Sequence, residues 1–340
     1  MKSPLLIIPK ERTRMYRPTN AWLSPAFTHT NRPIQQQKQQ QKDTSNEIAD
    51  LWDHIALKTL QQGKHKNLLK VKSDFQDIQI VEARDIRMYL NNQLQFSTLD
   101  ERIYHEALVH PVFSLTRSRK RVLIVGGGDG LAVREVLKYK DVKHVDLVDL
   151  DPEVLKAAKH NSSLVAINKS SLHDPRVKLH PMDAVKFLAD NPTPYNIIIV
   201  DFPDPTDQII SDLYTTEFYS MLKRSLTNDG LFVCQSNSPE DTPIVFWSIG
   251  KTIEAAGFRT LSYHTIVPSF GDWGFHIGSP KSITWSGNRV EVPHQTLPSQ
   301  LKDMSYFPYA MLAGKSKSVV NTKKNSNLHD IFKKEVLYLE

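Results

Sequence analysis

Residues 122–130 constrain the fold more than any other part of the sequence. The apolar residues 122–125 run into the glycine-rich segment 126–130, and a helical pattern follows over residues 131–138. This order predicts a buried parallel strand, a tight turn and a helix, because glycine permits positive φ and close approach of a ligand. Nucleosides bind in such strand-to-helix crevices. Asp129 lies inside the glycine segment, where its carboxylate would repel phosphate and attract a cationic amine, so the ligand is expected to be a cationic nucleoside without phosphate.

A second strand with a terminal acid supports the nucleoside prediction. Residues 143–151 are typical of the next parallel strand, and Asp149 follows the glycines at the spacing of about 20 residues at which an acid binds ribose hydroxyls. Asp151, Pro152 and Glu153 then mark the start of a helix. The alternative interpretation is a glycine turn in a parallel sheet, with a solvated Asp129.

Further polar side chains follow the other strands of the same predicted sheet. Strand and helix patterns alternate from residue 121 to about residue 280, which predicts an α/β fold with a doubly wound, mostly parallel, Rossmann-like sheet. Asp183 follows the third strand, Asp201 and Asp204 follow the fourth, and Gln235 ends the fifth. Because the carboxyl ends of parallel strands meet at one edge, these side chains are expected to line a single crevice.

The loop that carries Asp201 and Asp204 places two carboxylates close together in the sequence. The two acids are three residues apart in a segment stiffened by Pro203 and Pro205. Two fixed carboxylates can hold a diamine, or poise an amine for deprotonation. Asp183 can accept a hydrogen bond from the exocyclic amine of adenine. The alternative is a surface turn, because Asp and Pro are turn formers.

The sequence divides into four expected regions. These are a disordered basic tail rich in Gln and Pro (1–45), a small N-terminal domain with a helix and an antiparallel β-hairpin (46–115), a Rossmann-like catalytic domain of the class I methyltransferase type (116–285) and a C-terminal extension (286–340). The hairpin is expected to turn at Asn91 and Asn92, since Asn tolerates positive φ. A helix is expected over residues 46–60, and its apolar face comprises Ile48, Leu51, Trp52, Ile55 and Leu60.

Composition excludes several classes of protein. The net charge is +6, but residues 46–280 hold 26 basic and 30 acidic side chains, so the basic excess lies at the two ends. An acidic middle suits a cationic substrate and argues against a nucleic-acid partner. The apolar runs are too short to span a membrane. The single cysteine, Cys234, excludes an intramolecular disulfide and fits a cytoplasmic protein, and no metal site is expected because the 13 histidines are scattered.

These motifs together resemble the polyamine aminopropyltransferases, the spermidine and spermine synthases. The similarity runs from about residue 68 to residue 280. It rests on Gln76, the segment 94–101, the Tyr104-His105-Glu106 sequence, the loop 126–130, Asp149, Asp183, Asp201 with Asp204, and Gln235. The resemblance implies that decarboxylated S-adenosylmethionine is the co-substrate, that no prosthetic group is needed, and that a polyamine receives the aminopropyl group. It also implies a homodimer.

The resemblance also implies a role for each matched residue. The expected nucleoside site comprises Gln76, Gly126, Gly128, Asp149, Leu150, Asp183 and Ala184. His105 and Asp129 would face the aminopropyl amine, and Tyr104, Asp204 and Gln235 would line the acceptor channel. Asp201 would be the base, with Tyr104 and Asp204 as the other catalytic residues. Each also has a plainer interpretation: Tyr104 as a core residue, His105 as an exposed histidine and Gln235 as a polar strand end.

The chain departs from the common family pattern in its acid loop. Phe202 and Pro203 replace small hydroxyl residues, Thr206 follows where Gly-Pro is usual, and residues 268–274 replace a Pro-Thr-Tyr-Pro segment. These features resemble the long-form subgroup, whose catalytic domain is often fused to membrane helices. Putrescine is the expected acceptor, with spermidine, agmatine or another amine as alternatives. The competing functions are an S-adenosylmethionine-dependent methyltransferase and a non-catalytic polyamine or nucleoside sensor; a dinucleotide oxidoreductase fits less well, since Asp129 would face a pyrophosphate.

Overall fold

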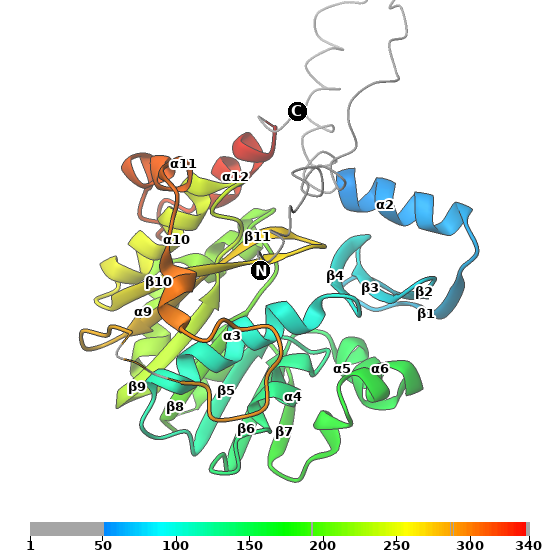
Figure 1. The fold of residues 1–340 in the computed structure, drawn as a ribbon, viewed down its shortest axis with the longest axis horizontal. Coiled ribbons are helices and arrows are strands. Elements are labelled where there is room, and N and C mark those ends of the chain that lie inside the picture. Colours follow the sequence, from blue (N-terminus) through cyan, green and yellow to red (C-terminus); the bar gives the residue numbers. More distant parts are fainter. Residues whose placement is uncertain (1–50, 192, 286, 288, 338–340) are drawn as a thin grey trace, which may run out of the picture. The chain divides into compact units, whose positions relative to one another are not determined.

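A computed structural model describes residues 51–337 except 192, 286 and 288. The predicted disordered tail over residues 1–45 lies outside this range. The described chain contains a four-stranded sheet in the order β1-β2-β3-β4 and a seven-stranded sheet in the order β10-β11-β9-β8-β5-β6-β7 (Figure 1). The predicted α/β class, with a small antiparallel sheet before a mostly parallel one, is confirmed.

The small sheet is fully antiparallel. Its strands are β1 (Lys66–Lys72), β2 (Asp77–Glu82), β3 (Ile86–Leu90) and β4 (Gln93–Ser97). The β3–β4 turn is at Asn91 and Asn92, with φ of 48° and 68°, as predicted. One face contributes Ile78 and Phe96 to the main core, so the small sheet is anchored on the larger one.

Helix α2 (Leu51–Gln62) lies before the small sheet. Its Leu57 side chain is buried and packs with Val81 and Tyr89 of the sheet. The predicted apolar face was wrong at Ile55, which is 43% exposed. Leu57 lies on the covered side together with the predicted Leu60, because the sheet, and not the local pattern, selects which residues are covered. Ile48 of the predicted face lies outside the described residues.

The large sheet has five parallel strands and an antiparallel edge. The parallel strands are β5 (Arg121–Gly126), β6 (His144–Asp149), β7 (Val177–Pro181), β8 (Tyr195–Asp201) and β9 (Leu226–Gln235). The strands β10 (Arg259–Val267) and β11 (Gly271–Ser279) add an antiparallel pair beside β9. The chain fills β5, β6 and β7 in one direction and then returns to β8 on the other side of β5. Such a reversal opens the ligand crevice at the strands' carboxyl ends.

Both faces of the large sheet are buried under helices. In β5, Val122 and Ile124 join one hydrophobic cluster, whereas Leu123 and Val125 join another, as the two-residue period of a strand requires. This explains the unbroken apolar run in the sequence. The described helices from residue 101 onward, not all of which contact the sheet, are α3 (Glu101–Leu115), α4 (Leu131–Val136), α5 (Pro152–His160), α6 (Ser162–Ile167), α7 (Ala184–Asp190), α8 (Gln208–Ser211), α9 (Thr216–Arg224), α10 (Pro243–Ala255), α11 (Tyr309–Leu312) and α12 (Leu328–Leu337).

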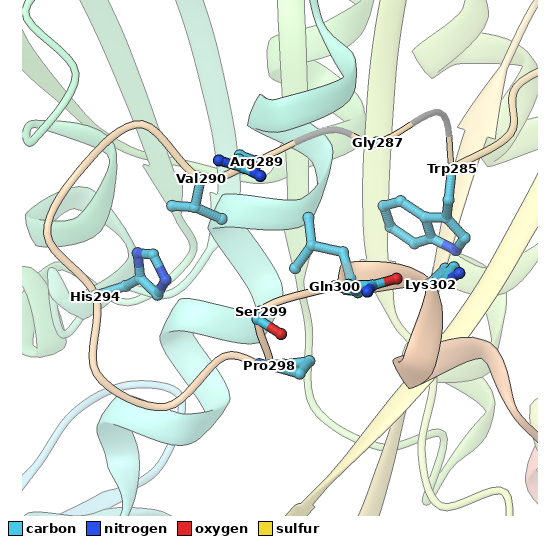
Figure 2. A pocket seen from close by; sticks show the side chains of 10 residues that line it. Trp285, Gly287, Arg289, Val290, His294, Pro298, Ser299, Gln300 and Lys302 are labelled. Carbon is cyan, nitrogen blue, oxygen red and sulfur yellow. The ribbon is translucent and has the colours of Figure 1, made fainter.

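The C-terminal residues pack closely on the Rossmann-like part of the chain. The α12 carboxylate of Glu335 accepts hydrogen bonds from the first α10 N–H groups, those of Ile244 and Val245, at 2.9 Å each. Residues 289–302 loop beside α3 and border a cavity of about 500 Å³ (Figure 2). Trp285, Val290 and Leu301 line its apolar part, and none of the predicted site residues borders it. Among the described residues, no helix combines the length and apolar character that crossing a membrane requires.

Candidate active site

The glycine loop after β5 brings two acidic strand ends together. Gly126 and Gly127 have φ of +80° and +65°, a conformation that other residues rarely adopt. A Cβ on Gly127 would lie 2.9 Å from Asp201 Oδ2, and one on Gly128 would lie 2.6 Å from Asp149 Oδ2. The loop therefore requires glycine because the carboxylates of β6 and β8 approach its backbone from either side.

Asp149 and its neighbours form the corner at the end of β6. Asp149 Oδ2 accepts from Gly128 N at 3.0 Å, and Oδ1 accepts from Asp151 N at 2.9 Å. Burial raises the pKa of Asp149 to about 6, against these two hydrogen bonds. Gln76 reaches the same corner from the β1–β2 turn, where its Nε2 donates to Asp151 Oδ2 at 2.9 Å. Asp151, which also accepts from Ser73 Oγ at 2.7 Å, is a member of this corner that the sequence marked only as a helix start.

The remaining predicted nucleoside residues lie beside this corner. Met182 N donates to Asp149 O at 3.0 Å, which brings the start of α7 next to the end of β6. Asp183 caps α7 by accepting from Lys186 N at 2.9 Å. Ala184 is buried, whereas Leu150 is half exposed.

Asp129 of the glycine loop and His105 of α3 act on each other through their charges. Asp129 Oδ1 accepts from Leu131 N at 2.8 Å, and burial raises the pKa of its carboxyl group although the charge of His105 opposes this. The His105 imidazole is buried, which alone would lower its pKa. The hydrogen bond with Glu101 and the charges of Asp129 and Asp201 outweigh burial, so the pKa of His105 is raised. The exposed-histidine interpretation is wrong, because His105 is 2% exposed.

Asp201 ends β8 at the reversal point of the sheet. Tyr104 Oη, from α3, donates to Asp201 Oδ1 at 2.5 Å. Burial raises the pKa of Asp201 to about 6; the charge of His105 and the Tyr104 bond lower it, and the charge of Asp129 raises it. Burial and the charge of Asp201 raise the pKa of Tyr104, and the charge of Asp204 adds to this.

An aromatic wall continues from Tyr104 towards β11. The Tyr104 ring centroid lies 6.0 Å from that of Phe270, 6.4 Å from Trp273 and 5.6 Å from Phe275. Tyr104 is 9% exposed and so also belongs to the core. Aromatic faces beside carboxylates favour an ammonium group, since both attract positive charge.

The backbone of the acid loop is held from behind by two buried side chains. Gln235 Nε2 donates to Phe202 O at 2.5 Å and to Tyr214 Oη at 2.9 Å, and Gln235 Oε1 accepts from Asn237 N at 3.1 Å. Tyr214 Oη donates to Pro203 O at 2.9 Å. Gln235 is 2% exposed. Since its whole amide bonds to the protein, the geometry favours a positioning role over the predicted contact with the acceptor.

A cluster of possible metal ligands lies elsewhere in the described chain. It comprises Glu106, His110 and Glu135. Lys138 and Arg134 form ion pairs with Glu135. Glu106 accepts three hydrogen bonds from backbone N–H groups and one from the Thr296 hydroxyl. These partners already neutralise or solvate the carboxylates, so the cluster is a poor fit for a divalent cation.

Comparison with known proteins agrees with this geometry. Residues 101–286 match the family model described as the spermine/spermidine synthase domain. Polyamine aminopropyltransferase 2 of Bacillus anthracis is 50% identical over 299 residues, which are 86% of this chain and 82% of that protein. The protein of the same name from Bacillus cereus is 47% identical over 301 residues, 87% and 82% of the two chains.

Solved structures agree on the fold. The crystal structure of a spermidine synthase in complex with the transition state analogue AdoDATO has a TM-score of 0.68 and 24% identity, over 74% of this chain and 89% of the other. At this identity the likeness concerns the fold alone. The family model and the Bacillus relatives go further: this chain belongs to the spermine/spermidine synthase family, a family of enzymes that includes the polyamine aminopropyltransferases.

Proposed function

We propose that this protein transfers the aminopropyl group of decarboxylated S-adenosylmethionine to a polyamine, with putrescine as the first candidate acceptor. The observation that carries the proposal is the half-buried Asp201 carboxylate, bonded to Tyr104 at 2.5 Å and acted on by the charges of His105 and Asp129. Asp201 as the base, the aromatic residues beside Tyr104 as an ammonium-binding surface and Asp149 with its neighbours as the nucleoside site would then lie along one sheet edge.

The donor would bind across the glycine loop. Asp149 and Gln76, together with Leu150, Asp183 and Ala184, support a nucleoside at the β6 corner, where an acid can accept from ribose hydroxyls. Asp129 would then face the amine of the aminopropyl arm. The carboxylate of intact S-adenosylmethionine would be repelled there, which favours the decarboxylated donor.

The transfer step needs a neutral amine, and Asp201 can produce one. The acceptor amine gives its proton to the Asp201 carboxylate. Its lone pair then attacks the carbon of the aminopropyl arm that is bonded to the sulfonium sulfur. The new N–C bond forms as the C–S bond breaks, and that electron pair returns to sulfur to leave neutral methylthioadenosine. A base that titrates near pH 6 is ionised at neutral pH and still able to hold a proton.

The main alternative is an S-adenosylmethionine-dependent methyltransferase. Asp129 argues against it, because the glycine loop would have to accept a donor carboxylate beside a carboxylate. A polyamine or nucleoside sensor without turnover is the non-enzymatic alternative. The intact Tyr104–Asp201 bond favours turnover over sensing.

One experiment tests the proposal. The purified protein is incubated with decarboxylated S-adenosylmethionine and a panel that contains putrescine, spermidine and agmatine, and the products are identified by mass. We expect methylthioadenosine and one aminopropylated amine. Asp201→Asn should lower the rate by about 10²–10⁴-fold. Asp207→Asn is the matched control, since Asp207 is exposed in the same loop and caps α8 through Ile210 N, a role that Asn also fills.

Three outcomes would overturn the proposal or part of it. Methylated product from S-adenosylmethionine would favour the methyltransferase. Binding without any product would favour the sensor, and full activity of Asp201→Asn would remove Asp201 as the base. The homodimer and the cytoplasmic location stay predictions, to be tested by light scattering and by cell fractionation.

A further inference from the structure

A buried ion pair joins α3 and α4 behind the candidate active site. Arg134 Nη1 donates to Glu101 Oε1 and Arg134 Nη2 donates to Glu101 Oε2, each at 2.8 Å. The side chains are 4% and 6% exposed. Two parallel bonds between planar groups fix the orientation of the carboxylate as well as its charge.

The same carboxylate contacts the imidazole of His105, on which the charges of Asp129 and Asp201 act. Glu101 Oε2 lies 3.1 Å from His105 Nδ1, and the Glu101 carbonyl oxygen lies 2.6 Å from the same nitrogen. Because a carbonyl oxygen can only accept, Nδ1 carries a proton. Within the described residues, Nε2 has no hydrogen-bond partner, and the ring is subject to the charges of Asp129 and Asp201.

We propose that Glu101 is a positioning residue for the transfer reaction: clamped by Arg134, it holds His105 by Nδ1 as a cation beside Asp129 and Asp201, and the cation keeps Asp201 ionised. The inference rests on the proposed function of Asp201 as the base. Glu101 on α3 and Arg134 on α4 would thus support the transfer step from outside the substrate site.

The charged groups around His105 set the sign of the expected effect. They are Glu101 on its own helix, Asp129 in the glycine loop and Asp201 at the end of β8, while Arg134 acts through Glu101. Burial favours the neutral imidazole, so loss of the Glu101 charge lowers the pKa of His105. Asp201 then loses the cation that favours its ionised form, and the pKa of Asp201 rises.

The test is the pH dependence of kcat/KM for Glu101→Gln. We expect the acid limb of the profile to move to higher pH by about one unit, the shift typical of a lost neighbouring charge, with activity largely regained above the new limb. Glu106→Gln is the matched control. Glu106 is a buried acid on the same helix, but it binds residues 295 and 296 and has no bond to His105. Its acid limb should stay where the wild type has it.

A second measurement does not depend on turnover. In protein labelled at the histidine rings, the His105 signal, assigned with His105→Asn, is followed by NMR against pH. The pKa of His105 should fall in Glu101→Gln and stay unchanged in Glu106→Gln. An unchanged His105 titration, or an equal loss of activity at every pH, would overturn the proposal. If the wild type transfers no aminopropyl group while His105 titrates as expected, the proposed function fails and the Glu101–His105 coupling stands.

A second variant covers the case in which Glu101→Gln fails to fold. Glu101→Gln leaves Arg134 with Glu135 as its remaining acid, and an uncompensated buried charge is destabilising. The double variant Glu101→Gln/Arg134→Gln removes both charges and is expected to be better tolerated. It should show the same lowered pKa of His105, because the carboxylate is missing in both variants. A wild-type His105 titration in the folded double variant would contradict the proposal.

Discussion

Removing one hydroxyl group tests the chemistry of the acid loop with little change in packing. In Tyr104→Phe the ring contacts with Phe270 and Phe275 remain, but the 2.5 Å bond to Asp201 Oδ1 is lost. That bond favours the ionised form of Asp201. Its loss therefore raises the pKa of Asp201.

The size of the effect follows from the strength of such a bond. A hydrogen bond to a charged group contributes about 1.5–3 kcal/mol, which corresponds to about 1–2 pKa units at 1.36 kcal/mol per unit. The pKa of Asp201 would move from about 6 to roughly 7–8. At pH 7 the ionised fraction would fall from about nine-tenths to between about one-half and one-tenth. We therefore expect kcat/KM at pH 7 to fall about two- to ten-fold, and to return near the wild-type value by about pH 9.

The assay is methylthioadenosine formation from pH 5.5 to 9.5 at limiting acceptor. Tyr219→Phe is the matched control: Tyr219 is another buried tyrosine, and its hydroxyl contacts Cys234 Sγ at 3.7 Å, away from Asp201. The control should leave the acid limb in place. A loss for Tyr104→Phe that is equal at pH 6 and pH 9 would refute the electrostatic reasoning and assign Tyr104 to acceptor binding alone.

Three further predictions concern the same sheet edge. Asp201→Asn should raise the Tm by several degrees at pH 8 and leave the Tm unchanged near pH 4. The folded-state pKa of Asp201, about 6, exceeds the ordinary 3.8, so the wild-type carboxylate makes the folded protein less stable as the pH rises through this interval. A lower Tm of the variant at pH 8 would contradict the argument from burial. Asp129→Asn should narrow the preference for decarboxylated S-adenosylmethionine over the intact donor, measured by calorimetry, and equal wild-type affinity for both donors would refute its role. Tyr214→Phe removes the bonds to Pro203 O and Gln235 and should lower kcat with little change in donor affinity; unchanged kcat would show that the loop holds its shape without them.

The sequence was sufficient to predict the sheet and its acidic edge. The apolar run of β5 reflects burial on both faces of the sheet, and the glycines after it reflect positive φ. Only a few residue types meet either requirement, so both can be recognised in the sequence. The rule that parallel strands end at one edge then brought Asp149 and Asp201 together without a structure. Gly127 and Gly128 leave room for these two carboxylates, where a Cβ would lie 2.9 Å and 2.6 Å from them.

The support behind the acids could not be predicted in the same way. Arg134 and Glu101 are 33 residues apart, and neither lies in a local pattern that marks an ion pair. Tyr214 holds the acid loop from the segment between α8 and α9, and its aromatic ring gave no sign of this role. Such partners are chosen by the packing of distant elements, so only the assembled fold identifies them. No strand was predicted beyond residue 235, so the antiparallel pair β10 and β11 was missed.

The fold explains why the acid loop can depart from the family pattern at residues 202 and 203. Gln235 and Tyr214 bind the main-chain carbonyls of residues 202 and 203, and main-chain bonds tolerate any side chain at these positions. The Phe202 ring turns into the core, where it lies 5.5 Å from the Phe218 ring, while Pro203 is exposed. The loop can therefore keep its acids in place while its outer surface changes. Differences in acceptor choice from other family members should accordingly be sought on the exposed side of the loop, at Pro203, and not at Phe202.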